Sequence, residues 1–279
     1  MKIGVTSYSF NNYVNQTGAN LLSLCDKAKE LGFDYIDFTA IKTDNPLKTA
    51  KELNEYCKKI GLEIVAYTVG ANFLADDINK EVQRLKEEIN VCKALGAKIF
   101  RHDVCYKLKT TPNYDYKSAI QEMTPYIKEL TLYAKSLGIE TCSENHGFIF
   151  QSPNRVEELI LSVNEKNYGW LLDIGNFLCD DVSPELGTIA ALKYLKHVHV
   201  KDFLFKSSTE KMPNGYQITT NGGNFLRGTI LGHGVVPVEK CINILKNYGY
   251  NGTLTIEFEG LEDNISALKL GLEYLKTII

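Results

Sequence analysis

The sequence predicts one α/β domain over residues 1–279, a (β/α)₈ barrel (TIM barrel) of parallel strands. Two observations predict this fold: eight short runs rich in β-branched and aromatic residues, and segments of helical periodicity between them. The length agrees, because a barrel of this kind needs about 250 residues. No linker, low-complexity tract or block of charge divides the chain.

The eight runs are the predicted strands. Because whole helices separate them, they must run parallel, and eight such strands form either a closed barrel or an open doubly wound sheet. An open sheet that binds a dinucleotide would carry a Gly-rich turn after its first strand, where this chain has Ser7-Tyr8-Ser9-Phe10, so the barrel is favoured. The strands are expected at Ile3–Thr6, Tyr35–Phe38, Glu63–Tyr67, Ile99–Arg101, Glu140–Ser143, Trp170–Asp173, His197–Val200 and Thr253–Phe258.

The helices between these strands are predicted to end at glycines. A glycine closes a helix in the left-handed conformation, and an apolar strand begins within a few residues of each one. The glycines are Gly32, Gly61, Gly96, Gly138 and Gly249. One segment interrupts the alternation: residues 203–234 contain six Gly and are predicted to form an irregular loop over a site.

Composition restricts the partners and the compartment. The net charge of −3 provides no broad attraction for nucleic acid or for an anionic membrane, so neither is an expected partner. No apolar run is long enough to span a bilayer, and the N-terminal residues do not resemble a signal peptide. The seven dispersed Cys form no C-x-x-C pair, which is typical of reduced thiols in the cytoplasm.

Four predicted strands deliver a carboxylate or an imidazole where their apolar residues end: Glu144, Asp173, His199 and Glu257. Taken singly, Glu144 could cap a helix, Asp173 could start a turn and Glu257 could form a salt bridge. All barrel strands end at one face, however, and three carboxylates meeting there would repel one another without a cation. We therefore predict one divalent metal ion, Mn²⁺ first, with Mg²⁺, Co²⁺ and Zn²⁺ as alternatives.

These strand ends resemble the xylose isomerase-like barrel superfamily and, within it, the sugar phosphate isomerase/epimerase group. The resemblance covers nearly the whole chain. It is carried by Glu144-Asn-His-Gly147, Leu172-Asp-Ile-Gly-Asn176, His199-Val-Lys-Asp202, Gly232-His-Gly234 and Ile256-Glu-Phe-Glu-Gly260. It implies that Glu144 and Glu257 face each other across a small carbohydrate substrate as an acid/base pair, with Asp173 and His199 completing the metal sphere.

The implied chemistry is removal of a proton next to a carbonyl through an enediolate, as in an isomerase or epimerase. Alternatives are a dehydratase or lyase of the same fold acting on inosose or 3-keto-glycosides, including C-glycoside cleavage, and a non-catalytic sugar-binding barrel. A DNA-repair endonuclease of the superfamily holds three zinc ions, which five His and an acidic charge balance argue against. The resemblance also allows a homo-oligomer.

Six further residues are candidates for binding the substrate, and His197 is an additional one because strand alternation places it on the same face as His199. Lys201 is a candidate either for a sugar hydroxyl or for an ion pair with Asp202. Two positions depart from the ketose 3-epimerases of the superfamily, which often have His where Asn176 stands and Gly-Glu where Lys201-Asp202 stands. The six candidates are Asn176, His102, His146, Lys201, Arg227 and His233.

Overall fold

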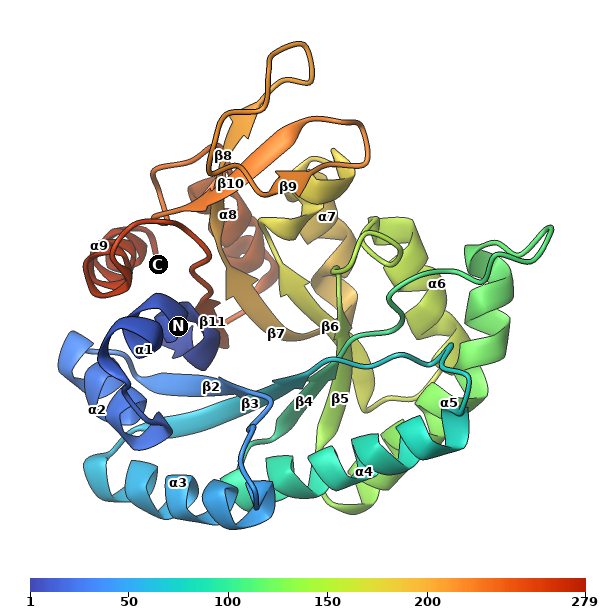
Figure 1. The fold of residues 1–279 in the computed structure, drawn as a ribbon, viewed down its shortest axis with the longest axis horizontal. Helices are drawn as coiled ribbons and strands as arrows, with labels where there is room; N and C mark the ends of the chain where they lie inside the picture. Colours follow the sequence, from blue (N-terminus) through green and yellow to red (C-terminus); the bar gives the residue numbers. More distant parts are fainter.

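The computed structural model describes residues 1–279 and contains a closed barrel of eight parallel strands (Figure 1). Around the barrel the order is β1-β11-β7-β6-β5-β4-β3-β2. This confirms the predicted fold class, and every predicted strand is present. The strands are β1 (Lys2–Thr6), β2 (Tyr35–Thr39), β3 (Glu63–Val69), β4 (Ile99–His102), β5 (Glu140–Glu144), β6 (Tyr168–Asp173), β7 (Leu195–Val200) and β11 (Thr253–Ile256).

Helices form a ring outside the strands in Figure 1. They are α1 (Asn11–Thr17), α2 (Leu21–Leu31), α3 (Pro46–Ile60), α4 (Ile78–Leu95), α5 (Tyr116–Ser136), α6 (Pro153–Val163), α7 (Pro184–Ala191), α8 (Val238–Tyr248) and α9 (Asn264–Ile278), with short 3₁₀ helices at Ser7–Phe10, Asn176–Asp180 and Leu192–Tyr194. The helices end at the predicted glycines. Gly32 after α2 has φ of 91° and Gly249 after α8 has φ of 90°, and such positive φ values are unfavourable for residues that have a Cβ atom. No helix combines the length and the apolar character needed to cross a membrane.

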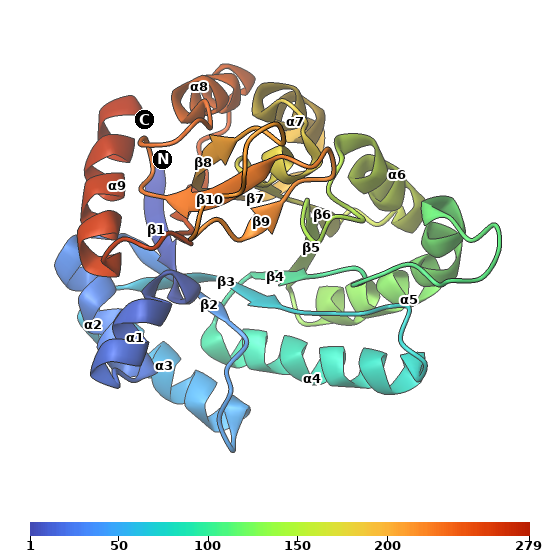
Figure 2. The ribbon, with the colours of Figure 1, turned by 45° about the horizontal axis from the view of Figure 1, so that its top comes forward.

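The segment expected as an irregular loop is more ordered than predicted. Within residues 203–234 and just before them lie β8 (Asp202–Lys206), β9 (Ile218–Thr219) and β10 (Phe225–Thr229), which form a three-stranded antiparallel sheet. This sheet stands apart from the barrel strands at the top of Figure 1, and in Figure 2 it overlaps β7 in the view. The prediction failed because the strands are short and six Gly dilute their pattern, whereas buried Phe203 and Leu226 anchor the sheet.

The largest apolar cluster surrounds the barrel, while the barrel interior is unusually polar. Asp37 of β2 contacts His197 of β7, and these strands are not neighbours, so the contact crosses the interior. Tyr35 fills the space beside Gly4, where a Cβ atom would lie 2.2 Å from the Tyr35 ring. On the other side of the interior a small apolar cluster packs Ala66, Ile99, Cys142 and Leu171. The polar half of the interior lies directly below the candidate site.

Candidate metal centre

The structure brings together the four residues predicted as metal ligands. Glu144 and Asp173 end β5 and β6, His199 is the penultimate residue of β7, and Glu257 follows β11. Each offers one ligand atom, and these atoms all lie within 4.8 Å of one another. Glu144, His199 and Glu257 line a pocket of about 400 Å³ at the carboxyl ends of the strands. Barrel enzymes build their active sites at this face.

Glu144 is held by two donors. Its Oε1 accepts a hydrogen bond from the Asn176 side-chain amide at 2.8 Å, and its Oε2 lies 2.7 Å from Nη2 of Arg101. Arg101 also lies 2.9 Å from Oδ1 of Asp103. Burial lowers the pKa of the Arg101 guanidinium, but Glu144 and Asp103 outweigh it and the pKa is raised, so Arg101 keeps its charge. The guanidinium fixes the Glu144 carboxylate at the wall of the pocket.

Lys201 compensates three carboxylates from inside the protein. Its Nζ lies 2.6 Å from Glu257 Oε2, 3.4 Å from Asp173 Oδ2 and 3.4 Å from Glu259 Oε1, and its side chain is only 3% exposed. Burial disfavours the charged forms of both Lys201 and Glu257. The neighbouring carboxylates nevertheless raise the pKa of Lys201 well above its usual value. Lys201 and His199 in turn lower the pKa of Glu257 well below its usual range. Glu257 is therefore an ionised carboxylate beside an ammonium group.

Asp173 and His199 keep unsatisfied polar atoms. Asp173 Oδ1 accepts the backbone N–H groups of Gly175 and Asn176, both at 2.9 Å, but its Oδ2 accepts no hydrogen bond. Burial raises the pKa of Asp173, and the nearby carboxylates of Glu144 and Glu257 raise it further. Lys201 acts in the opposite direction, and the resulting pKa is about 7. Both ring nitrogens of His199 also lack hydrogen-bond partners, although the ring is almost fully buried.

A divalent ion fits these observations. Buried polar atoms are rarely left without a partner, and two of them, Asp173 Oδ2 and His199 Nδ1, belong to a set of oxygen and nitrogen donors that suits such an ion. Burial lowers the pKa of His199, but the carboxylates of Asp37 and Glu257 outweigh it and raise the value to about 10. Bound metal would compete with that proton, because only the unprotonated nitrogen can be a ligand.

Three of the six predicted substrate-binding residues lie at the site. Asn176 reaches Glu144, Lys201 reaches Glu257, and half-exposed His146 lines the pocket with its Nδ1 2.9 Å from Asp103 Oδ1. The considered ion pair between Lys201 and Asp202 does not form. The Asp202 carboxylate instead accepts four backbone N–H groups, from Phe203, Gly232, Gly234 and Val236.

The other three predicted residues neither line the pocket nor form a hydrogen bond or ion pair with a candidate ligand. His102 is fully buried, stacks on Tyr168 and hydrogen-bonds the carbonyl of Asp103. Arg227 lies in β10, whose register directs it to Glu262 at 3.2 Å. His233 is exposed on the loop after β10. Their expected roles therefore have no support in the geometry.

Several residues at the site were not predicted. Arg101, Asp103 and Glu259 contact the candidate ligands or their partners, and Asp37 lies beneath His199. A usable signal exists for two of them: Asp37 and Arg101 are single charged residues inside otherwise apolar strands. Such residues are rarely buried unless they are paired.

Comparisons with known proteins agree with the fold. The profile of the xylose isomerase-like TIM barrel family matches residues 25–278. Inosose dehydratase of Serratia proteamaculans is 25% identical over 212 residues, 68% of this chain and 67% of that protein. L-ribulose-5-phosphate 3-epimerase of Escherichia coli is 24% identical over 269 residues, 89% of this chain and 86% of that protein.

Solved structures share the whole architecture. The IolI protein, crystallised with a bound zinc atom, superposes with a TM-score of 0.78 and 18% identity, covering all of this chain and 98% of its own. At this identity the likeness shows the fold alone. The matching profile spans nine-tenths of the sequence, and the chain belongs to the xylose isomerase-like TIM barrel family.

Proposed function

We propose that this protein is a metal-dependent isomerase or epimerase that moves a proton at a carbon next to the carbonyl of a sugar, sugar phosphate or keto-sugar. One observation carries the proposal: Glu144, Asp173, His199 and Glu257 converge from four strands at a pocket of about 400 Å³. That volume is within the range of pockets that hold small molecules. The small carbohydrate is the expected partner.

Glu257 and Glu144 are the proposed acid/base pair. Glu257 is ionised through its contacts with Lys201 and His199, which is the protonation state that a base requires. Glu144, held by Asn176 and Arg101, must begin this step protonated to return a proton, and it ends the step as a carboxylate while Glu257 keeps the proton taken from carbon. A divalent ion held by Glu144, Asp173, His199 and Glu257 would polarise the carbonyl and stabilise the negative oxygen of the enediolate.

The site to which the proton returns decides the product. Return to the opposite face of the same carbon gives an epimer, and return to the neighbouring carbon gives an aldose–ketose isomer. The epimerase reading is supported by the Escherichia coli relative, a 3-epimerase of L-ribulose 5-phosphate. We expect Mn²⁺ as the ion, with Zn²⁺ supported by the IolI structure. The seven unpaired cysteines support a reducing, cytoplasmic location.

A second candidate is a dehydratase or lyase acting on an inosose or a 3-keto-glycoside. The base removes the proton next to the carbonyl, and the electron pair of that C–H bond forms a C=C bond. The leaving group takes a proton from an acid and departs as water from an inosose, or as the free aglycone from a 3-keto-glycoside. His146 favours this reading, because it lines the pocket and can protonate a leaving group. Burial lowers the pKa of His146, but the hydrogen bond to Asp103 outweighs it and raises the value. The Serratia relative supports the same reading.

The test measures metal content and then proton exchange. The purified protein is loaded with Mn²⁺ and incubated in D₂O with ketoses, ketose phosphates, an inosose and 3-keto-glycosides. We expect about one metal per chain and deuterium at a single carbon. An epimer or isomer supports the first candidate, and loss of water or release of an aglycone supports the second.

The acid/base pair is tested with Glu257→Gln, which should cut exchange by at least about 100-fold, the lower end of what one acid or base contributes. Glu262→Gln is the matched control, since Glu262 pairs with Arg227 outside the pocket. Near-normal exchange by Glu257→Gln would refute the two-Glu mechanism. Absence of both metal and exchange would replace it with a non-catalytic sugar-binding barrel.

A further inference from the structure

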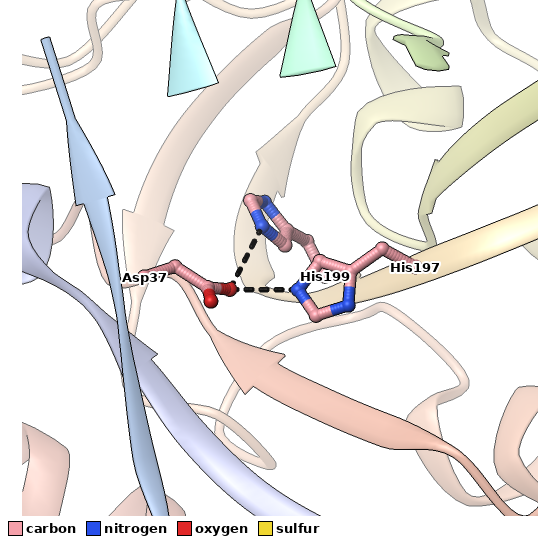
Figure 3. A group of neighbouring side chains, drawn as sticks. All are labelled: Asp37, His197 and His199. Atoms are coloured by element: carbon pink, nitrogen blue, oxygen red, sulfur yellow. Dashed lines mark hydrogen bonds and ion pairs between the residues drawn. The ribbon is translucent and has the colours of Figure 1, made fainter. Parts of the chain in front are cut away.

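A buried polar cluster lies directly beneath the proposed metal site. It consists of Asp37 on β2, His197 on β7 and Thr255 on β11, and each is at most 1% exposed. Figure 3 shows the Asp37 carboxylate pointing between the rings of His197 and His199. Because these strands surround the barrel interior, the cluster supports His199 from below.

Hydrogen bonds fix the position of the Asp37 carboxylate. Its Oδ1 accepts the backbone N–H of Ala66 at 2.9 Å, and its Oδ2 accepts the Thr255 hydroxyl at 2.6 Å. Oδ2 also lies 2.7 Å from Nε2 of His197. Asp37, His197 and His199 could by proximity hold an ion of their own. Three hydrogen-bond donors already stabilise the negative charge of Asp37, so this carboxylate does not require an ion, and we assign it a different role.

The donor and the acceptor of the hydrogen bonds in this cluster can be assigned, because the Asp37 carboxylate can only accept. Thr255 donates to Asp37, so the Tyr35 hydroxyl, 2.8 Å from Thr255 Oγ1, must donate to Thr255. His197 faces the Asp37 carboxylate with Nε2, which therefore carries a hydrogen, and its Nδ1 lies 2.9 Å from the Thr253 hydroxyl. Three donors reach Asp37: the Ala66 N–H at Oδ1, and Thr255 and His197 at Oδ2. A carboxylate offers about four acceptor positions, so Asp37 can accept one more donor, with its open position on Oδ1.

His199 has two nitrogens with different surroundings. Nδ1 lies 3.8 Å from Oε2 of Glu257, on the side of the proposed ligands. Nε2 lies 3.8 Å from Oδ2 of Asp37, on the side of the buried cluster. Neither nitrogen has a hydrogen-bond partner. A neutral imidazole carries one N–H, and a metal ion must take the other nitrogen.

We infer that Asp37 is the positioning residue of the metal centre: it accepts the Nε2–H of His199 and so presents Nδ1 to the ion. The inference rests on the proposed function, because it assumes that His199 is a ligand. A carboxylate bound to the far nitrogen of a ligating imidazole orients the ring and strengthens it as a donor. His197, Thr255 and Ala66 act one step further out, by fixing Asp37.

The nitrogen assignment is tested on the wild-type chain loaded with Zn²⁺. Nuclear magnetic resonance of protein labelled with ¹⁵N at histidine distinguishes a zinc-bound nitrogen from one that carries a hydrogen. We expect zinc at Nδ1 of His199 and hydrogen at Nε2. Zinc at Nε2 would overturn the inference, because Asp37 could not then accept a hydrogen from that atom.

The contribution of Asp37 is tested with Asp37→Asn. We expect the affinity for Zn²⁺, measured by titration calorimetry, to fall about 10- to 100-fold, the usual cost of losing such a partner. Asp202→Asn is the matched control, since Asp202 is also a buried carboxylate, 2% exposed, bound to backbone N–H groups. The control should lose thermal stability without a comparable loss of zinc affinity.

Four outcomes decide between the inference and its alternatives. Wild-type zinc affinity in Asp37→Asn would overturn the inference, and so would an equal loss of affinity in Asp202→Asn, which would indicate general destabilisation. If Asp37→Asn does not fold, the nitrogen assignment in the wild type decides alone. A wild-type chain that binds no metal would refute the proposed metal centre itself, and this result is obtained before any variant is compared.

Discussion

Replacing Lys201 by methionine tests whether this ammonium group holds the site together without metal. Lys201 lies within 3.4 Å of three carboxylates and is 3% exposed. Removing one partner of a buried ion pair costs about 3–5 kcal/mol, because the opposite charge is left uncompensated. Methionine keeps most of the side-chain volume, so a cavity contributes little. We therefore expect the metal-free variant to lose about 3–5 kcal/mol of unfolding free energy.

The expected shift in melting temperature follows from the chain length. Unfolding entropy of about 2.1 cal/mol/K per residue gives about 0.6 kcal/mol/K for 279 residues, so the metal-free variant should melt about 5–9 °C below the wild type. Added Mn²⁺ supplies positive charge to the same carboxylates. Its stabilising effect should therefore be larger in Lys201→Met than in the wild type.

Scanning calorimetry with and without Mn²⁺ measures both quantities. Lys196→Met is the control, because Lys196 pairs with half-exposed Glu140 at the opposite end of β5. Such a pair contributes less than about 1 kcal/mol, and its loss should not depend on metal. Equal destabilisation of Lys201→Met with and without Mn²⁺ would refute charge compensation as the role of Lys201.

Two further predictions concern the loop after β10 and the decrease of unfolding free energy at acidic pH. Gly234→Ala should lower the unfolding free energy by about 1–3 kcal/mol, because its Cβ would lie 2.2 Å from Asp202 Oδ1 and force the loop to move. Urea unfolding measures this loss, and wild-type stability of the variant would contradict the described loop geometry. Burial lowers the pKa of His102 to about 4, so the unfolded chain binds its proton near pH 6.5 and the folded chain does not. Stability should fall between pH 6.5 and 4 by up to about 3 kcal/mol from this group, and His102→Gln should flatten that slope; an unchanged slope would show that other groups cause it.

The fold could be predicted because its signals are local. Most barrel strands are short runs rich in apolar and β-branched residues, and glycines such as Gly32 and Gly249 mark where helices stop. The predicted strand over Thr253–Phe258 is longer than β11, which ends at Ile256, because the apolar pattern continues into the site. The exact residue at which a strand ends is harder to predict than the strand itself, because local contacts decide where the ladder of hydrogen bonds stops.

The site could be predicted only in part, because its contacts join distant residues. Strand ends identified the four candidate ligands, since parallel strands in a barrel share one polar end. The partners of these residues depend on which interior side chains meet after the barrel closes. Asp37 and His197 are 160 residues apart, and no local pattern reveals that they touch. Arg227 illustrates the converse: the sequence indicated an irregular loop there, but the segment contains β10, and Arg227 on that strand lies 3.2 Å from Glu262.

Closure of the barrel has a consequence for how the chain is made. β1 pairs with β11, and Lys2 is opposite Thr253, so the first strand waits for a partner roughly 250 residues away. At about 5–20 residues per second, synthesis of that length takes roughly 12–50 s, during which β1 and each newly added strand present open edges. Glu257 leaves the ribosome directly after the closing strand. Completion of the sheet and completion of the four-residue centre therefore coincide, and a nascent chain cannot capture its ion with all four side chains beforehand.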